Sequence, residues 1–134
     1  MVKTVILSKK RYKKLGYILH PEFSHVYCDN FHTWISHRDD VVVHRKDIMF
    51  EHLHPSMGKS VPDEFYIKAS TPDEYNKGSK IFHDLIKKNF DKNTEKKIIS
   101  RFISESNPFK KYISAYVLIT SGFDKNKLLK FINK

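Results

Sequence analysis

The spacing of apolar and polar residues divides the chain near residue 71 into a part with short apolar runs and a part with helical periodicity. Short runs rich in β-branched and aromatic residues, bounded by turn residues, are typical of strands. From Asn30 to Ser36 one or two helical turns are expected, with Asn30 as the cap. The runs that predict strands are Val2–Leu7, His25–Cys28, Val41–His44 and Asp47–His52.

Capping residues predict the helices of the second part. Thr71 is followed by Pro72 at the first helical position and by Glu74 three residues after the cap, which is the pattern of a capping box. An apolar stripe with a spacing of three to four residues continues this helix to about Asn89. Three more helices are expected: Thr94 to about Glu105, Pro108–Ser121 opened by Asn107 and closed by Gly122, and Lys125–Asn133 opened by Asp124.

These patterns together predict one α+β domain, in which a small mixed sheet is followed by a C-terminal helical region. A chain of 134 residues with 40% hydrophobic residues is long enough for a modest core. No apolar run approaches the roughly 20 residues of a membrane span, and Met1–Ser8 is too short for a secretory signal. We therefore expect a soluble, cytoplasmic protein, and the single Cys28 agrees with a reducing compartment.

The net charge of +10 is unevenly distributed. Residues 1–14 carry six Lys or Arg and no acid, residues 15–85 carry seven against eleven acids, and residues 86–134 carry twelve against four. Seven of the eight histidines fall between His20 and His54, within the acidic centre. Because a nucleic-acid-binding domain is expected to place its basic residues beside its reading elements, this separation makes nucleic acid an unlikely partner.

Two positions in the centre are candidates for chemistry. His52 and His54 flank Leu53, so on an extended strand both rings project to the same side and could bind one metal. Two ligands are fewer than the three or four that tetrahedral zinc requires, and spacing identifies no others. Asp29 follows the run Val26–Cys28, where it is either a catalytic carboxylate at a strand end or a turn or helix-cap residue.

Three segments together resemble the carboxyl-terminal half of a GT-A-type glycosyltransferase domain. They read KKRYKKLGYILHPEFSHVYCDNFHTWIS, DIMFEHLHPSMGKSVPDEFY and EYNKGSKIF, and they cover roughly Ser8 to Ile86. The resemblance is to the family 2-like enzymes of bacteriophages and bacteria, and three motifs in order are more specific than one. It implies that residues 1–90 form a glycosyltransferase-like half domain and that residues 91–134 are a basic helical tail packed on it.

The resemblance also implies roles for individual residues. Asp29 matches the general base that accepts a proton from the acceptor hydroxyl. His52, or else His54, matches the histidine near a divalent metal, Mn or Mg, that neutralises the leaving diphosphate of a nucleotide-sugar. A glycan or another hydroxyl compound would be the acceptor. The segment that closes over the substrates is matched by Lys59, Asp63, Glu64 and Tyr66.

The chain departs from the family pattern because it starts after the nucleotide-binding half and the Asp-x-Asp pair. Asp39 and Asp40 are adjacent rather than spaced, so they do not replace that pair. Sugar transfer is therefore expected only when a donor-binding half complements the chain. An incomplete sheet would expose an edge and apolar surface, which favours a separate N-terminal-half chain or a homo-oligomer.

Two alternatives of other classes remain open. A small metal-dependent nuclease or nucleic-acid-binding protein would use the histidines for a metal and the basic flanks for phosphates. A non-catalytic interaction module would use the aromatic residues of the first part as a core or a docking surface.

Overall fold

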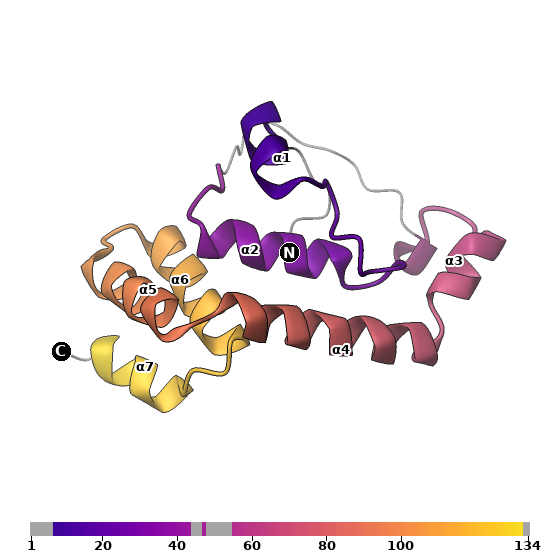
Figure 1. The fold of residues 1–134 in the computed structure, drawn as a ribbon. Helices are drawn as coiled ribbons and strands as arrows, with labels where there is room; N and C mark the ends of the chain where they lie inside the picture. Colours follow the sequence, from indigo (N-terminus) through magenta and orange to yellow (C-terminus); the bar gives the residue numbers. More distant parts are fainter. Residues whose placement is uncertain (1–6, 44–46, 48–54, 133–134) are drawn as a thin grey trace. The chain divides into compact units, whose positions relative to one another are not determined.

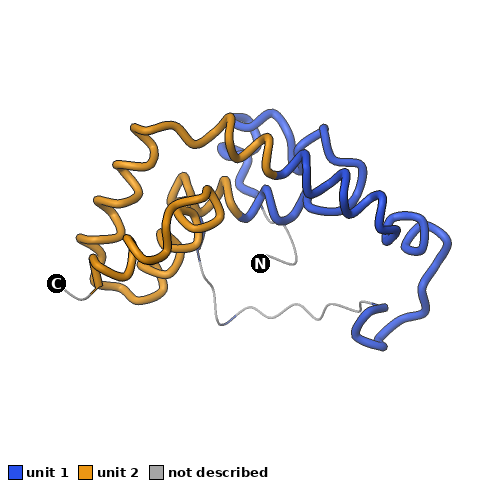
Figure 2. The backbone as a smooth tube through the Cα atoms, turned by 90° about the horizontal axis from the view of Figure 1, so that it is seen from below, with its two compact units in different colours: residues 1–33, 42–82 blue, residues 34–41, 83–134 orange. Residues whose placement is uncertain are grey.

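The computed structural model describes residues 7–43, 47 and 55–132, which form helices joined by turns (Figure 1). The chain divides into two compact units (Figure 2). Unit 1 comprises residues 1–33 and 42–82, and unit 2 comprises residues 34–41 and 83–134. The described elements are α1 (Lys9–Leu15), α2 (Cys28–Arg38), the 3-10 helix η1 (Pro55–Met57), α3 (Glu64–Ala69), α4 (Pro72–Asn89), α5 (Lys92–Ser104), α6 (Pro108–Thr120) and α7 (Lys125–Ile132).

The expected α+β fold is wrong, because the described residues contain helices and no strand. The run His25–Cys28 is a turn that leads into α2, and residues 41–43 have no regular structure. The runs Val2–Leu7 and Asp47–His52 lie almost wholly outside the described residues. A GT-A domain is built around a sheet, so the GT-A assignment is corrected together with the fold class.

The helical turns predicted from Asn30 to Ser36 are confirmed within α2, but the helix begins at Cys28, so Asn30 is not its cap. Burial explains why this segment is helical. Phe31, Trp34 and Ile35 are all less than 5% exposed. Trp34 and Ile35 follow Phe31 by three and four residues, so the three side chains lie on one face of a helix. A strand would direct Trp34 and Ile35 to opposite sides. The run His25–Cys28 is too short to reveal this period, whereas the eleven residues of α2 show it.

The helices of the second part are confirmed. The amide of Glu74 donates to Thr71 Oγ1 at 3.3 Å at the start of α4. Asn107 Oδ1 accepts from the amides of Phe109 and Lys110 at 3.0 and 3.3 Å at the start of α6. The helix α5 begins two residues before the predicted Thr94, because Asp91 is its cap.

Rings from three segments pack together in unit 1. His20 makes edge-to-face contacts with Tyr17 and Phe31, at centroid distances of 4.9 and 5.3 Å. Phe82 of α4 contacts the Tyr27 ring at 5.6 Å. On the same helix a Cβ at Gly78 would lie 2.8 Å from the carbonyl oxygen of Val26, so only glycine allows this close approach.

The core of unit 2 is built from one buried face of each contributing helix. These faces leave the remaining positions of the helices free for lysines. The apolar residues that are less than 5% exposed are Trp34, Ile35, Leu85, Ile86, Ile98, Phe102, Ile113, Val117, Leu118 and Leu128.

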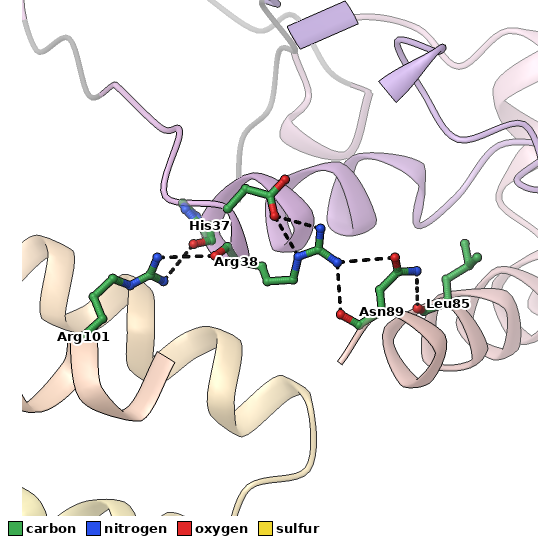
Figure 3. A network of polar contacts seen from close by, with 6 residues as sticks. His37, Arg38, Leu85, Asn89 and Arg101 are labelled. Atoms are coloured by element: carbon green, nitrogen blue, oxygen red, sulfur yellow. Dashed lines mark hydrogen bonds and ion pairs between the residues drawn. The ribbon is translucent and has the colours of Figure 1, made fainter. Parts of the chain in front are cut away.

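Two arginines donate hydrogen bonds to the C-terminal ends of helices in unit 2 (Figure 3). The guanidinium of Arg101 donates to the carbonyl oxygens of His37 at 2.9 Å and Arg38 at 3.4 Å, the last two residues of α2. Arg38 in turn donates to the carbonyl oxygen of Asn89, the last residue of α4, at 3.0 Å. Helix-terminal carbonyls have no partner within their own helix, so each arginine satisfies acceptors and places a positive charge at the negative end of the dipole.

Candidate functional site

The structure places Asp29 in the first turn of α2 rather than at the end of a strand. Its carboxylate accepts a hydrogen bond from the amide of Asn30 at 2.9 Å, and its carbonyl accepts from Thr33 Oγ1 at 2.8 Å. The side chain is half-buried. An acidic residue in a first helical turn interacts favourably with the helix dipole, so the position has a sufficient structural explanation.

Three of the four residues matched to the substrate-binding segment lie together at the start of α3. Asp63 is the cap, and its carboxylate accepts from the amide of Tyr66 at 2.7 Å. Glu64 is the first helical residue and is exposed. Lys59 is exposed in the segment between η1 and α3. Asp63 therefore has a capping role here, and substrate binding by this segment stays a prediction.

His52 and His54 lie outside the described residues. Within residues 7–43, 47 and 55–132, no group of three or more His, Cys, Asp or Glu is placed to hold a metal ion. The expected divalent metal therefore stays a prediction.

A polar cluster that the sequence patterns did not indicate joins the loop before α2 to α4. Ser24 Oγ donates to Glu74 Oε2 at 2.7 Å, and His25 Nδ1 lies 3.6 Å from the same oxygen. The hydrogen bond from Ser24 lowers the pKa of Glu74. Both Ser24 and His25 face the carboxylate, whereas in a nucleophilic triad the imidazole stands between the hydroxyl and the acid. These contacts therefore connect the loop to α4 and do not form a nucleophilic triad.

The thiol of Cys28 is held in its protonated form. Its Sγ donates to the carbonyl oxygen of His25 at 2.9 Å. Burial raises the pKa of Cys28, and the negative charge of Asp29 adds to this effect. Since the thiolate is the nucleophile, this cysteine is poorly suited to covalent chemistry.

The strongest chemical feature of the described residues is the positive surface of unit 2. The sequence of this unit carries thirteen Lys or Arg against seven Asp or Glu. Its exposed lysines come from four helices: Lys87 and Lys88 of α4, Lys92, Lys96 and Lys97 of α5, Lys110 of α6, and Lys125, Lys127 and Lys130 of α7.

Most acids of unit 2 are engaged by groups of the protein itself. Asp91 caps α5 by accepting from the amide of Thr94 at 2.7 Å, and Asp124 accepts from the amide of Asn126 at 2.7 Å. Asp39 pairs with Arg38 at 2.8 Å. Carboxylates at helix starts are partly neutralised by the helix dipole, whereas the lysines project into solvent. The surface that a partner would meet is therefore positive.

The sequence indicated this charge, and the resemblance placed it on a basic helical tail, residues 91–134, packed on the half domain. Which lysines are exposed and which acids are engaged became visible only from the packed helices. The fold and this surface define the chain as a basic helical module.

No protein-family model matches this chain, and neither a curated protein nor a solved structure is similar to it at a significant level. Among the described helices, none combines the length and the apolar character needed to cross a lipid bilayer.

Proposed function

We propose that this chain is a nucleic-acid-binding protein that contacts phosphates through the lysines of unit 2. The observation that carries the proposal is the contrast between nine exposed lysines on α4, α5, α6 and α7 and the engaged acids of the same unit. Lysines neutralise phosphates and release the counterions condensed on the nucleic acid, which drives binding without any base contact.

The positive charge counts against nucleic acid only if the histidine-rich centre holds an active site on a sheet, away from that charge. The described part of that centre is helical or irregular, and Ser24 within it hydrogen-bonds to Glu74 of α4. The basic helices are therefore not peripheral to a known site, and they become the leading candidate surface.

Salt dependence is the property that tests this proposal directly. Affinity for single- and double-stranded oligonucleotides would be measured by fluorescence anisotropy between about 50 and 200 mM salt. Each lysine that contacts a phosphate contributes about 0.7 to 0.9 to the slope of log affinity against log salt. Replacing Lys96 and Lys97 of α5 with Gln is expected to reduce this slope and to weaken binding to all sequences alike.

A matched pair on α4 provides the control. Lys77 and Lys80 are also exposed, but they belong to unit 1, and changing both to Gln removes the same charge. This variant is expected to retain most of the affinity and the slope. The proposal is overturned if neither form of nucleic acid binds at low salt, or if both double variants lose affinity equally.

A further inference from the structure

We infer that α3 docks against α7 of a second copy of this chain, so that two copies form a two-fold dimer. The contact pairs an acidic helix face that carries an exposed apolar residue with a basic helix face that carries two. The inference goes beyond the proposed function, although the two share the lysines of α7. In a two-fold dimer the contact forms twice, because each copy contributes one α3 and one α7.

The α3 segment, residues 61–75, carries large apolar side chains that unit 1 does not bury. Val61 is 89% exposed, and Ile67 of α3 is 60% exposed. Phe65 contacts the His25 ring at a centroid distance of 4.7 Å and is still 65% exposed. The buried residue of α3 is the small Ala69. Single exposed apolar residues are ordinary, but several in one short segment mark an interaction surface.

The charge of the α3 segment is negative. Glu64 is exposed, and Ile67 follows it by three residues, so the two share one face of α3. An acidic surface repels nucleic acid and anionic lipid, so its complement is a basic partner that also offers apolar side chains. The segment contains four acids and one basic residue, which are Asp63, Glu64, Asp73, Glu74 and Lys68.

The helix α7 has the complementary character. Leu129 and Ile132 are 45% and 54% exposed, and Lys125 is exposed as well. These three residues are separated by four and three positions, so they share one face of the helix. The core of unit 2 takes a different residue from α7, Leu128, which is 3% exposed. The helix contains three lysines and no acid, so its outer face is positive.

A parallel arrangement of α3 and the second copy's α7 matches charge and apolar contact together. Glu64 then lies opposite Lys125, and Ile67 lies opposite Leu129, since each apolar residue follows its charged residue by about one turn. Lys68 is also exposed on this face of α3, and it then lies toward the negative, C-terminal end of the α7 dipole. Because the chain itself carries both faces, a second copy is the occupant that these observations favour.

Sedimentation velocity of the full chain without nucleic acid tests the dimer. We expect reversible association with a dissociation constant on the order of micromolar. It should weaken between about 50 and 500 mM salt, because salt screens the charged pair. Ile67→Ser and Leu129→Ser are each expected to weaken association about tenfold. Val43→Ser is the matched control, because Val43 is an apolar residue of unit 1 that is 79% exposed and lies outside the α3 segment.

A charge exchange identifies the pair. Glu64→Lys and Lys125→Glu each bring like charges together and are expected to weaken association about fivefold. A chain with both changes has an attractive pair again and is expected to associate like the original chain. The inference is wrong if the original chain stays monomeric at about 100 µM in low salt. It is also wrong if Ile67→Ser associates like Val43→Ser, or if the double variant associates no better than the single ones.

The outcome is separate from that of the phosphate-binding test. Ile67→Ser retains every lysine of unit 2, so its affinity for oligonucleotides is expected to match that of the original chain. The absence of a dimer would therefore leave the proposed function standing, and the absence of nucleic-acid binding would leave the dimer standing.

Discussion

Asp40 occupies, at the end of α2, the backbone position that Gly122 occupies at the end of α6. Both residues have positive φ, 55° and 89° respectively. In both helices the next amide donates to the carbonyl oxygen five residues earlier, from Val41 to Ser36 at 3.1 Å and from Phe123 to Leu118 at 2.9 Å. This is the Schellman motif, in which glycine is favoured because a Cβ disfavours the left-handed conformation.

Substitutions at these two positions are expected to have opposite effects. Gly122→Ala should lower the free energy of unfolding by about 1 kcal/mol, because its Cβ meets no atom within 4 Å and only the left-handed backbone is penalised. Asp40→Gly should raise it by about 0.5 kcal/mol, since it relieves the same strain and removes a negative charge from a helix C-terminus. Urea unfolding of both variants provides the measurement. Changes of the same sign in the free energy of unfolding would contradict this account.

Gly78 is expected to resist substitution for a different reason. Alanine would gain about 1 kcal/mol in helix propensity at this position of α4. Its Cβ would lie 2.8 Å from the carbonyl oxygen of Val26, and this backbone atom cannot move aside as a flexible side chain would. A net destabilisation of about 1 kcal/mol or more is expected. Lys80→Ala, an exposed change on the same helix, is the control, and a stabilised Gly78→Ala variant would show that the contact is loose.

Arg101 is expected to contribute strongly to the stability of unit 2. Its Nε donates to Ser114 Oγ at 2.9 Å, in addition to the two carbonyls at the end of α2. Arg101→Ala should therefore cost about 2 to 3 kcal/mol, because it removes the charged donor from the carbonyls of His37 and Arg38 and from the Ser114 hydroxyl. Arg101→Lys should recover only part of this loss, since an ammonium cannot reproduce the planar fork. Thermal unfolding with Lys97→Ala as the control would test this, and equal stability of all variants would refute it.

His37 is expected to make the fold sensitive to mild acid. Burial lowers the pKa of His37 to about 4, and the positive charge of Arg101 adds to the effect. An unfolded histidine has a pKa of about 6.5, so between these values the unfolded chain binds more protons than the folded chain. Stability is therefore full above the unfolded pKa and falls as the pH is lowered toward 4.

The variant His37→Gln isolates this effect. It removes the titrating group, so its urea midpoint should fall less than that of the original chain between about pH 7 and pH 4.5. His32, whose pKa burial also lowers, contributes in the same direction and is present in both proteins. An identical pH profile for the two proteins would exclude His37 as the source.

The described helices overturn the GT-A fold. They do not test sugar transfer, which stays a prediction. It requires a metal-dependent site for a nucleoside diphosphate at His52. Calorimetry with uridine diphosphate and manganese would reveal saturable binding that His52→Ala abolishes, with Asp29→Ala as a second variant. The absence of binding up to about millimolar concentration, a free energy of about −4 kcal/mol, would end this prediction for the isolated chain.

Local signals were sufficient for the helices of the second part. Thr71, Asn107 and Asp124 start helices because a side-chain oxygen within three residues satisfies an amide that the helix leaves unpaired. Such a contact depends on neighbouring residues only, so it can be predicted from sequence. The positions of the lysines and the net positive charge follow directly from the sequence.

The tertiary structure decided what these local signals leave open. The run before Asp29 could start a strand or a helix, and the burial of Phe31 and Trp34 against other segments selects the helix. Exposure likewise depends on packing: on the apolar helix α6, Val117 is buried while Tyr112 faces solvent. The amino-acid sequence by itself thus determined the capped helices, the helical turns after Asn30 and the charge, whereas long-range burial determined that the run before Asp29 leads into a helix and which side chains face solvent.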